Sequence, residues 1–300
     1  MKDKNTVIGI VLLAILFFVF FWYTNKEQTA YTETQQHIAD SLHRDSMTKI
    51  TPQQKAAAKL DSLHTDSLAE IKKAGNFKQT VNIPEQLVTV ENNLIKIVFT
   101  SKGGRVKSVE LKNYNSQTGG KVVLGGSDKD GIGYNLNTGE NHSASSTDLN
   151  FTSSSPVKNA DGSQTVEFTL MDSAHSAIIH EYKIKPDSYL IDWNIKLNGA
   201  SGLLTNNTLN FHFVSQLMQV EKSVDYERRM SDVCFSQGNE FDYISSHTDE
   251  TFDKPVQWLS SVQQFFNTTV IAKNNFKGGA VHWTRATDSS LEIGVVDATL

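Results

Sequence analysis

The sequence of 300 residues has a single cysteine, no excess of basic residues and only one long hydrophobic run. One cysteine excludes an internal disulfide framework and a metal site built from several thiolates. The formal net charge is −5 at pH 7, so the overall charge gives no argument for nucleic acid as a partner. Cys234 lies in a strand-like run, where a small buried residue is expected, with a nucleophile as the alternative.

The short signatures of catalysis are also missing. The sequence contains no GxSxG, HExxH or DxDxDG segment. We therefore predict no catalytic, cofactor-binding or metal-binding residue and no cofactor. One enzyme hypothesis stays open, because a large β-sandwich with exposed aromatic side chains could bind sugars or act as an epimerase. That hypothesis requires a cleft in which His180 or His212 stands beside a carboxylate.

The one long hydrophobic run, residues 7–23, follows Lys2 and Lys4 and is uncharged. As a helix it would be about 26 Å long, enough to cross a thin hydrocarbon core. Its length and the absence of a small-x-small cleavage site favour an uncleaved anchor over a cleaved signal peptide. Trp22 and Tyr23 stand where an interfacial aromatic belt is expected. The basic start favours a cytoplasmic N-terminus, which places the rest of the chain outside the cytoplasmic membrane.

Residues 26–80 are polar, and a segment of this composition cannot bury enough apolar surface to fold alone. The sequence pattern of residues 39–50 is repeated in residues 60–71, at an offset of 21 residues, which is three heptads. A coiled coil would use such a repeat, but the apolar positions spread over nearly half of the helix surface. The histidines that recur with the repeat lack a third metal ligand. We predict a solvated, partly helical spacer, divided at Pro52.

From about residue 81 the hydrophobic pattern changes to an alternation with period two, which is typical of half-buried strands. The clearest examples are QTVEFTLMD, YLIDWNIKLNG and LNFHFVSQL, and turn-forming residues separate such runs. The pattern predicts a mainly β fold: an antiparallel sandwich over residues 81–300, after an anchor at 1–25 and a spacer at 26–80. About 220 residues exceed a simple sandwich, so we expect extra strands.

The segment FTSKGGRVKSVELKNY offers two interpretations of Gly103 and Gly104. A glycine pair followed by Arg105 and Lys107 could hold a phosphate, but phosphate loops of the common types need a following helix. The preceding residues form a strand pattern, and neither a GxGxxG nor a GK[ST] sequence is present. A tight hairpin turn is the favoured interpretation, because glycine supplies the positive φ that such turns need.

Several segments, in this order, resemble the YidC-type membrane protein insertases of Gram-negative bacteria. The segment VTVENNLIKIVFTSKGGRVKSVELKNYN resembles the first hairpin of that family, and DYERRMSDVCF and EFDYIS resemble the middle of its periplasmic domain. PVQWLSSVQQFFNTTVIAK resembles a family segment with a tryptophan, two glutamines and two aromatic residues. The residues that carry the likeness are Gly103, Gly104, Trp258, Gln263, Gln264, Phe265 and Phe266.

The resemblance implies a β-supersandwich in the periplasm and one span in the inner membrane. It implies no enzymatic activity, but assistance to the insertion and folding of inner-membrane proteins, with or without the Sec translocon. The implied partners are the Sec translocon and its accessory subunits, nascent membrane proteins and the lipid bilayer, without nucleic acid. A helical membrane core with a positively charged groove performs insertion in the family. No second spanning run occurs here, so we expect a chain truncated at Leu300 within a longer insertase. The alternative is a membrane-tethered carbohydrate-binding or epimerase-like sandwich.

Two further expectations concern packing. In the tryptophan-containing segment, the side chains expected in the core are Trp258, Val262 and either Phe265 or Phe266, while Gln263 and Gln264 are expected at a turn or edge; a direct partner contact is the alternative. Arg228 and Arg229 are expected on a solvated face, with docking to an acidic partner as the alternative.

Overall fold

The computed structural model describes residues 69, 71–81, 83–140, 142–173, 176–199, 201–204, 208–245, 248–288 and 290–300. The chain divides into two compact units, Met1–Ser67 and Leu68–Leu300, and the described residues belong to the second. The predicted anchor, with Trp22 and Tyr23, and most of the predicted spacer lie outside the described residues. Within the described ranges, no helix is long and apolar enough to cross a membrane.

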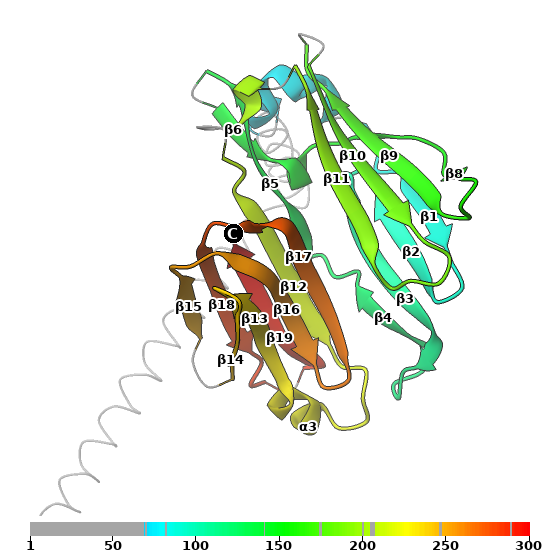
Figure 1. Cartoon of the computed structure of the whole chain (residues 1–300), viewed down its shortest axis with the longest axis vertical. Helices are drawn as coiled ribbons and strands as arrows, with labels where there is room; N and C mark the ends of the chain where they lie inside the picture. The colour runs from blue at the N-terminus through cyan, green and yellow to red at the C-terminus, as the bar shows by residue number, and fades with distance from the viewer. Residues whose placement is uncertain are drawn as a thin grey trace, which may run out of the picture. The chain divides into compact units, whose positions relative to one another are not determined.

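The described unit is mainly β, as the alternating patterns predict (Figure 1). Its strands are β1 Leu87–Glu91, β2 Ile95–Thr100, β3 Arg105–Asn115, β4 Lys121–Gly125, β5 Gly131–Gly139, β6 His142–Ser145, β7 Thr152–Ser153, β8 Val157–Lys158, β9 Gln164–Met171, β10 Ala177–Ile184, β11 Ile191–Asn198, β12 Phe211–Met218, β13 Ser231–Gln237, β14 Glu240–Ile244, β15 Asp249–Phe252, β16 Val256–Gln263, β17 Phe266–Phe276, β18 Gly279–Arg285 and β19 Glu292–Thr299. The helices are η1 Gly75–Thr80, η2 Ser146–Asp148, η3 Ser201–Leu203 and α3 Val224–Arg229.

The strands form four antiparallel sheets. Their orders are β1-β2-β3-β4; β11-β10-β9-β7, with β8 also on β9; β15-β18-β19-β12-β5-β6; and β14-β13-β16-β17. Short turns connect most pairs of neighbouring strands, as antiparallel pairing allows. The length beyond a simple sandwich is therefore used for a second pair of sheets.

The first core lies between the β1–β4 sheet and the sheet of β7 to β11. Alternation decides which side chains enter it: on β9 the inward residues are Val166, Phe168 and Leu170, as the sequence pattern predicts. Residues at the end of the predicted spacer also belong to this core, because Ala74 and Phe77 are fully buried in it.

The second core lies between the six-stranded sheet and the sheet β14-β13-β16-β17. Trp283 of β18 is its largest member, and Phe213 of β12 and Phe235 of β13 also belong to it. Strand β5 links the two cores, because its Tyr134 and Leu136 belong to the first core while its Ile132 packs against the second. Trp193 and Leu209 pack against both cores.

Candidate interaction surface on the β16–β17 hairpin

The Gly103–Gly104 pair forms the turn between β2 and β3, as predicted. Their φ angles are +80° and +55°, in the left-handed region that favours glycine. The Gly104 carbonyl accepts hydrogen bonds of 2.8 Å from His180 Nδ1 and from the Tyr182 hydroxyl. A strand rather than a helix follows, so the helix N-terminus that the phosphate interpretation requires does not form here.

The β16–β17 hairpin carries all five family-like residues from Trp258 to Phe266. Alternation along β16 turns Trp258, Ser260 and Val262 to the outer face of the sheet, and Leu259, Ser261 and Gln263 to the second core. The prediction that Trp258 and Val262 are core residues is therefore wrong, because both are only half-buried.

Gln263 is 2% exposed, so its assignment to a turn or edge is also wrong. Its Nε2 donates to the carbonyl of Met218 and to Glu227 Oε1 at 2.6 Å. These bonds satisfy a polar side chain that the register of β16 forces inward. Gln264 does occupy the turn, with φ +46°.

The two phenylalanines after the glutamines differ in environment. Phe265 is 70% exposed at the tip of the hairpin. Phe266 is partly buried against the first core, and its ring meets Tyr114 edge to face, with centroids 5.5 Å apart. The hairpin therefore shows Phe265 to solvent and uses Phe266 for packing.

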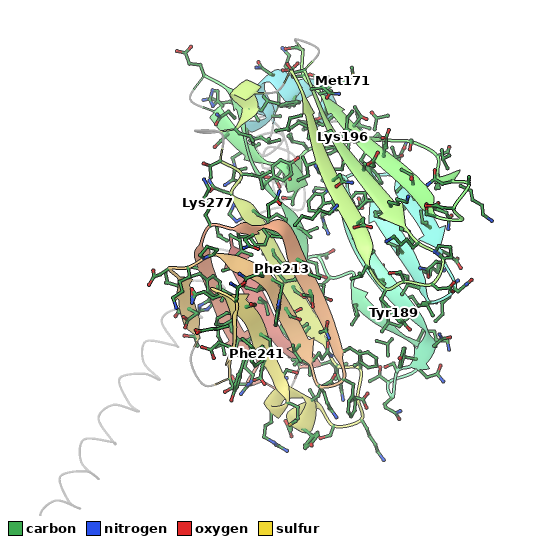
Figure 2. The ribbon with its side chains drawn as sticks, viewed as in Figure 1. Met171, Tyr189, Lys196, Phe213, Phe241 and Lys277 are labelled. Atoms are coloured by element: carbon green, nitrogen blue, oxygen red, sulfur yellow. The ribbon has the colours of Figure 1, made fainter. Side chains whose placement is uncertain are left out.

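A row of apolar side chains crosses the outer face of the sheet β14-β13-β16-β17. We call it the outer row; it consists of Phe241, Tyr243, Trp258 and Ile271. The strand register places Phe241 opposite Ser236, Ser236 opposite Trp258, and Trp258 opposite Ile271. The Phe241 ring centroid lies 6.2 Å from those of both Tyr243 and Trp258. Phe241 lies on this sheet in Figure 2 and is 65% exposed.

Arg228 is buried, which contradicts its expected place on a solvated face. Its guanidinium donates four hydrogen bonds of 2.7–2.9 Å to the carbonyls of Asp288, Ser290 and Glu292. The side chain therefore fixes the loop between β18 and β19. Arg229, its neighbour, is exposed as expected and lies over the ring of Tyr226.

The two histidines of the epimerase hypothesis do not meet its condition. His180 is fully buried among aromatic rings; its Nε2 lies 2.7 Å from the Tyr134 hydroxyl. Burial lowers the pKa of His180 to about 4, so its imidazole is neutral. His212 contacts the Asn135 amide and the Thr299 hydroxyl rather than a carboxylate.

Cys234 lies on β13, as the strand-like run predicts, and is half-buried. Burial, followed by the charge of Asp232, raises the pKa of its thiol. A thiol that resists ionisation is a poor nucleophile, which argues against the catalytic alternative.

A cleft of about 460 Å³ opens beside the first core. Its lining combines Lys73 and Lys102 with Glu85 and Asp148, so the formal charges of the lining cancel. Within the described ranges, no three histidine, cysteine or carboxylate side chains gather as they would around a metal ion. The exposed aromatic side chains of the second sandwich are thus the more distinctive surface feature.

Two antiparallel sandwiches, the second with an exposed outer row, define the described part of the chain as a β-sandwich domain. The family model of the YidC periplasmic domain matches residues 87–299, from the start of β1 to the end of β19, and the chain belongs to this family.

Individual relatives agree with the family match. The chain is 32% identical over 284 residues to the membrane protein insertase YidC of Bacteroides fragilis, covering 92% of this chain and 44% of the relative. It is 26% identical over 281 residues to that of Phocaeicola vulgatus, covering 91% and 43%. It is 27% identical over 274 residues to that of Cytophaga hutchinsonii, covering 89% and 42%. The chain thus spans less than half the length of these curated relatives.

Proposed function

We propose that the protein assists the insertion and folding of inner-membrane proteins, and that residues 81–300 form its periplasmic domain. The observation that carries the proposal is the family match over residues 87–299. Relatives that align with more than nine-tenths of the chain are named membrane protein insertase, and this supports the same activity.

The proposal assigns three roles along the chain. Residues 7–23 anchor it by a single span with a cytoplasmic N-terminus, and Trp22 and Tyr23 stand at the membrane interface. The spacer separates the anchor from the folded domain. The β domain meets partners outside the membrane: nascent membrane proteins, and the Sec translocon with its accessory subunits.

A depletion experiment tests the proposed function. The gene that contains this chain is placed under a repressible promoter in its own host, and pulse-labelled inner-membrane proteins are probed with protease. We expect these proteins to lose their protected membrane fragments within a few generations, because polar segments cannot cross hydrocarbon unaided. Secreted proteins without membrane spans serve as the control. Unchanged insertion after complete depletion would contradict the proposal.

A further inference from the structure

The outer row is not required by either core of the fold. None of its four members belongs to the two clusters of buried residues or to the side chains packed against them. Phe241, Tyr243 and Ile271 are 65%, 51% and 59% exposed. Adjoining exposed aromatic side chains of this kind mark interaction sites more often than scattered single ones do.

The edge of the second sandwich beside the outer row is acidic. Strand β14 is an edge of the four-stranded sheet and β15 an edge of the six-stranded sheet. Over the described residues 240–245 and 248–254, carboxylates outnumber lysines; the carboxylates are Glu240, Asp242, Asp249, Glu250 and Asp253, and the lysine is Lys254. Glu240 and Asp242 flank Phe241 in the sequence and are exposed; alternation turns them to the opposite face from Phe241 and Tyr243, at the free edge of β14.

Carboxylates alone would be explained as protection of an edge strand, since charge discourages pairing with another chain. Protection does not explain Phe241 and Tyr243, because exposed aromatic side chains on the same strand promote association. The combination matches a partner that carries positive charge next to apolar groups. Aromatic faces attract lysine and arginine, and carboxylates pair with the same cations.

We infer that the outer row and the acidic β14–β15 edge together bind a polypeptide segment in which lysine or arginine stands next to apolar or aromatic residues. Lying along the free edge of β14, that segment covers Phe241 and Tyr243 on the outer face with its apolar residues. Its cations meet Glu240 and Asp242 on the opposite face of the same strand. The inference concerns binding alone and does not rest on the proposed function.

Two other occupants fit the surface less well. A second copy of this chain, paired through the same edge, would set like carboxylates against each other, which costs free energy and disfavours that contact. A neutral oligosaccharide could stack on the rings but would leave the carboxylates without a role.

The inference is tested with the whole chain in neutral lipid nanodiscs and a fluorescent peptide of about twelve residues, in which lysine alternates with leucine and tyrosine. Fluorescence anisotropy gives the dissociation constant. The comparison peptide carries glutamate in place of every lysine. Binding of the lysine peptide at least about tenfold tighter than the glutamate peptide is expected, with the difference shrinking at high salt.

Variants locate the binding site. Phe241→Ser with Tyr243→Ser should weaken binding about tenfold or more, because exposed aromatic anchors carry much of the affinity of an interface. Glu240→Gln with Asp242→Asn should weaken binding at low salt only. Phe265→Ser is the matched control, since Phe265 is equally exposed on the hairpin tip, and it should leave binding unchanged.

Three results would overturn the inference. The first is equal affinity for the lysine and glutamate peptides. The second is unchanged affinity after the Phe241 and Tyr243 substitutions in a protein whose circular dichroism is normal. The third is that the protein binds a neutral hexasaccharide, loses this binding in the same double variant, and does not bind the lysine peptide.

Discussion

The amide of Gln263 donates a 2.6 Å hydrogen bond to the carboxylate of Glu227, and both side chains are buried. The contact joins the β16–β17 hairpin to α3. The same carboxylate accepts from the backbone N–H groups of Val220 and Glu221, at 3.2 and 3.1 Å. These backbone groups and the Gln263 amide are hydrogen-bond donors to a fully buried carboxylate.

Replacing Gln263 by alanine should lower the free energy of unfolding by about 2–3 kcal/mol, because a buried carboxylate would lose a donor that cannot be replaced by water. Urea unfolding followed by circular dichroism measures the change. The variant Gln263→Ala in a Glu227→Gln background should cost less, since the buried partner is then uncharged. Equal costs in the two backgrounds would show that the pair is not coupled.

Arg228 and the adjacent Arg229 offer a matched comparison. Arg228→Ala should lower the free energy of unfolding by about 3 kcal/mol, because the carbonyl groups of Asp288, Ser290 and Glu292 would lose four hydrogen bonds from a charged donor. The ion pairs of Arg228 with Asp225 and Asp288 contribute little, since both carboxylates are largely exposed. Arg229→Ala should change stability by less than about 0.5 kcal/mol. A similar loss in both variants would contradict the structural role assigned to Arg228.

Gly104 and Gly120 both have positive φ, +55° and +75°, but only Gly104 is crowded. A Cβ at Gly104 would lie 2.9 Å from the Phe151 ring and 3.0 Å from Phe168 Cβ, whereas Gly120 has nothing within 4 Å. Gly120→Ala should cost about 1 kcal/mol through backbone strain alone. Gly104→Ala should cost about 2–4 kcal/mol, because the clash with the first core is added. Thermal unfolding of both variants side by side measures the difference.

The buried His180 predicts a pH dependence of stability. Burial lowers its pKa from 6.5 to about 4, so between these values the unfolded chain binds the proton more readily than the folded chain. The contribution of neutral His180 to the free energy of unfolding is complete above about pH 6.5 and is lost as the pH falls toward 4. At pH 5 the loss should be roughly 2 kcal/mol relative to pH 7.5.

His180→Gln provides the control for this pH dependence. The variant should be less stable at pH 7.5 and should lose less stability on acidification. Burial also raises the pKa of Asp130, an effect of opposite sign that is common to both proteins and cancels in the comparison. Parallel stability curves for wild type and variant between pH 7.5 and 5 would contradict the neutral, buried state of His180.

Much of the fold could be predicted from alternation along the strands. The patterns around Val166, Phe168 and Leu170 predict the inward face of β9 because a half-buried strand repeats every two residues. The Gly103–Gly104 turn was also predictable, because few other residues tolerate positive φ at two successive positions. The division into two cores could not be predicted, because alternation shows which face of a strand is buried but not which sheet packs against that face.

The environments of Trp258, Gln263 and Arg228 could not be predicted, for a shared physical reason. Residue type predicts burial on average, but the register of β16 decides which face each side chain takes. Register turns the tryptophan outward and the glutamine inward, where Glu227 satisfies it. Arg228 is buried because the carbonyls of a loop 60 residues away in sequence satisfy it. Such long-range partners leave no local signal in the sequence.

The outer row was equally hidden in the sequence. Phe241 and Trp258 are 17 positions apart, and only the pairing of β13 with β14 and β16 brings them together. The acidic composition of residues 240–254 is visible in the sequence, but its relation to exposed aromatic side chains requires the sheet.

The most direct test of the central claim is insertion in a purified system. The complete product of the gene that contains this chain is reconstituted into liposomes, and a nascent membrane protein is supplied without nucleotide. The expected result is a protease-protected fragment that appears only when the protein is present in the liposomes. If the complete product yields no protected fragment while a related YidC insertase does so in the same liposomes, the assignment to membrane protein insertion is contradicted.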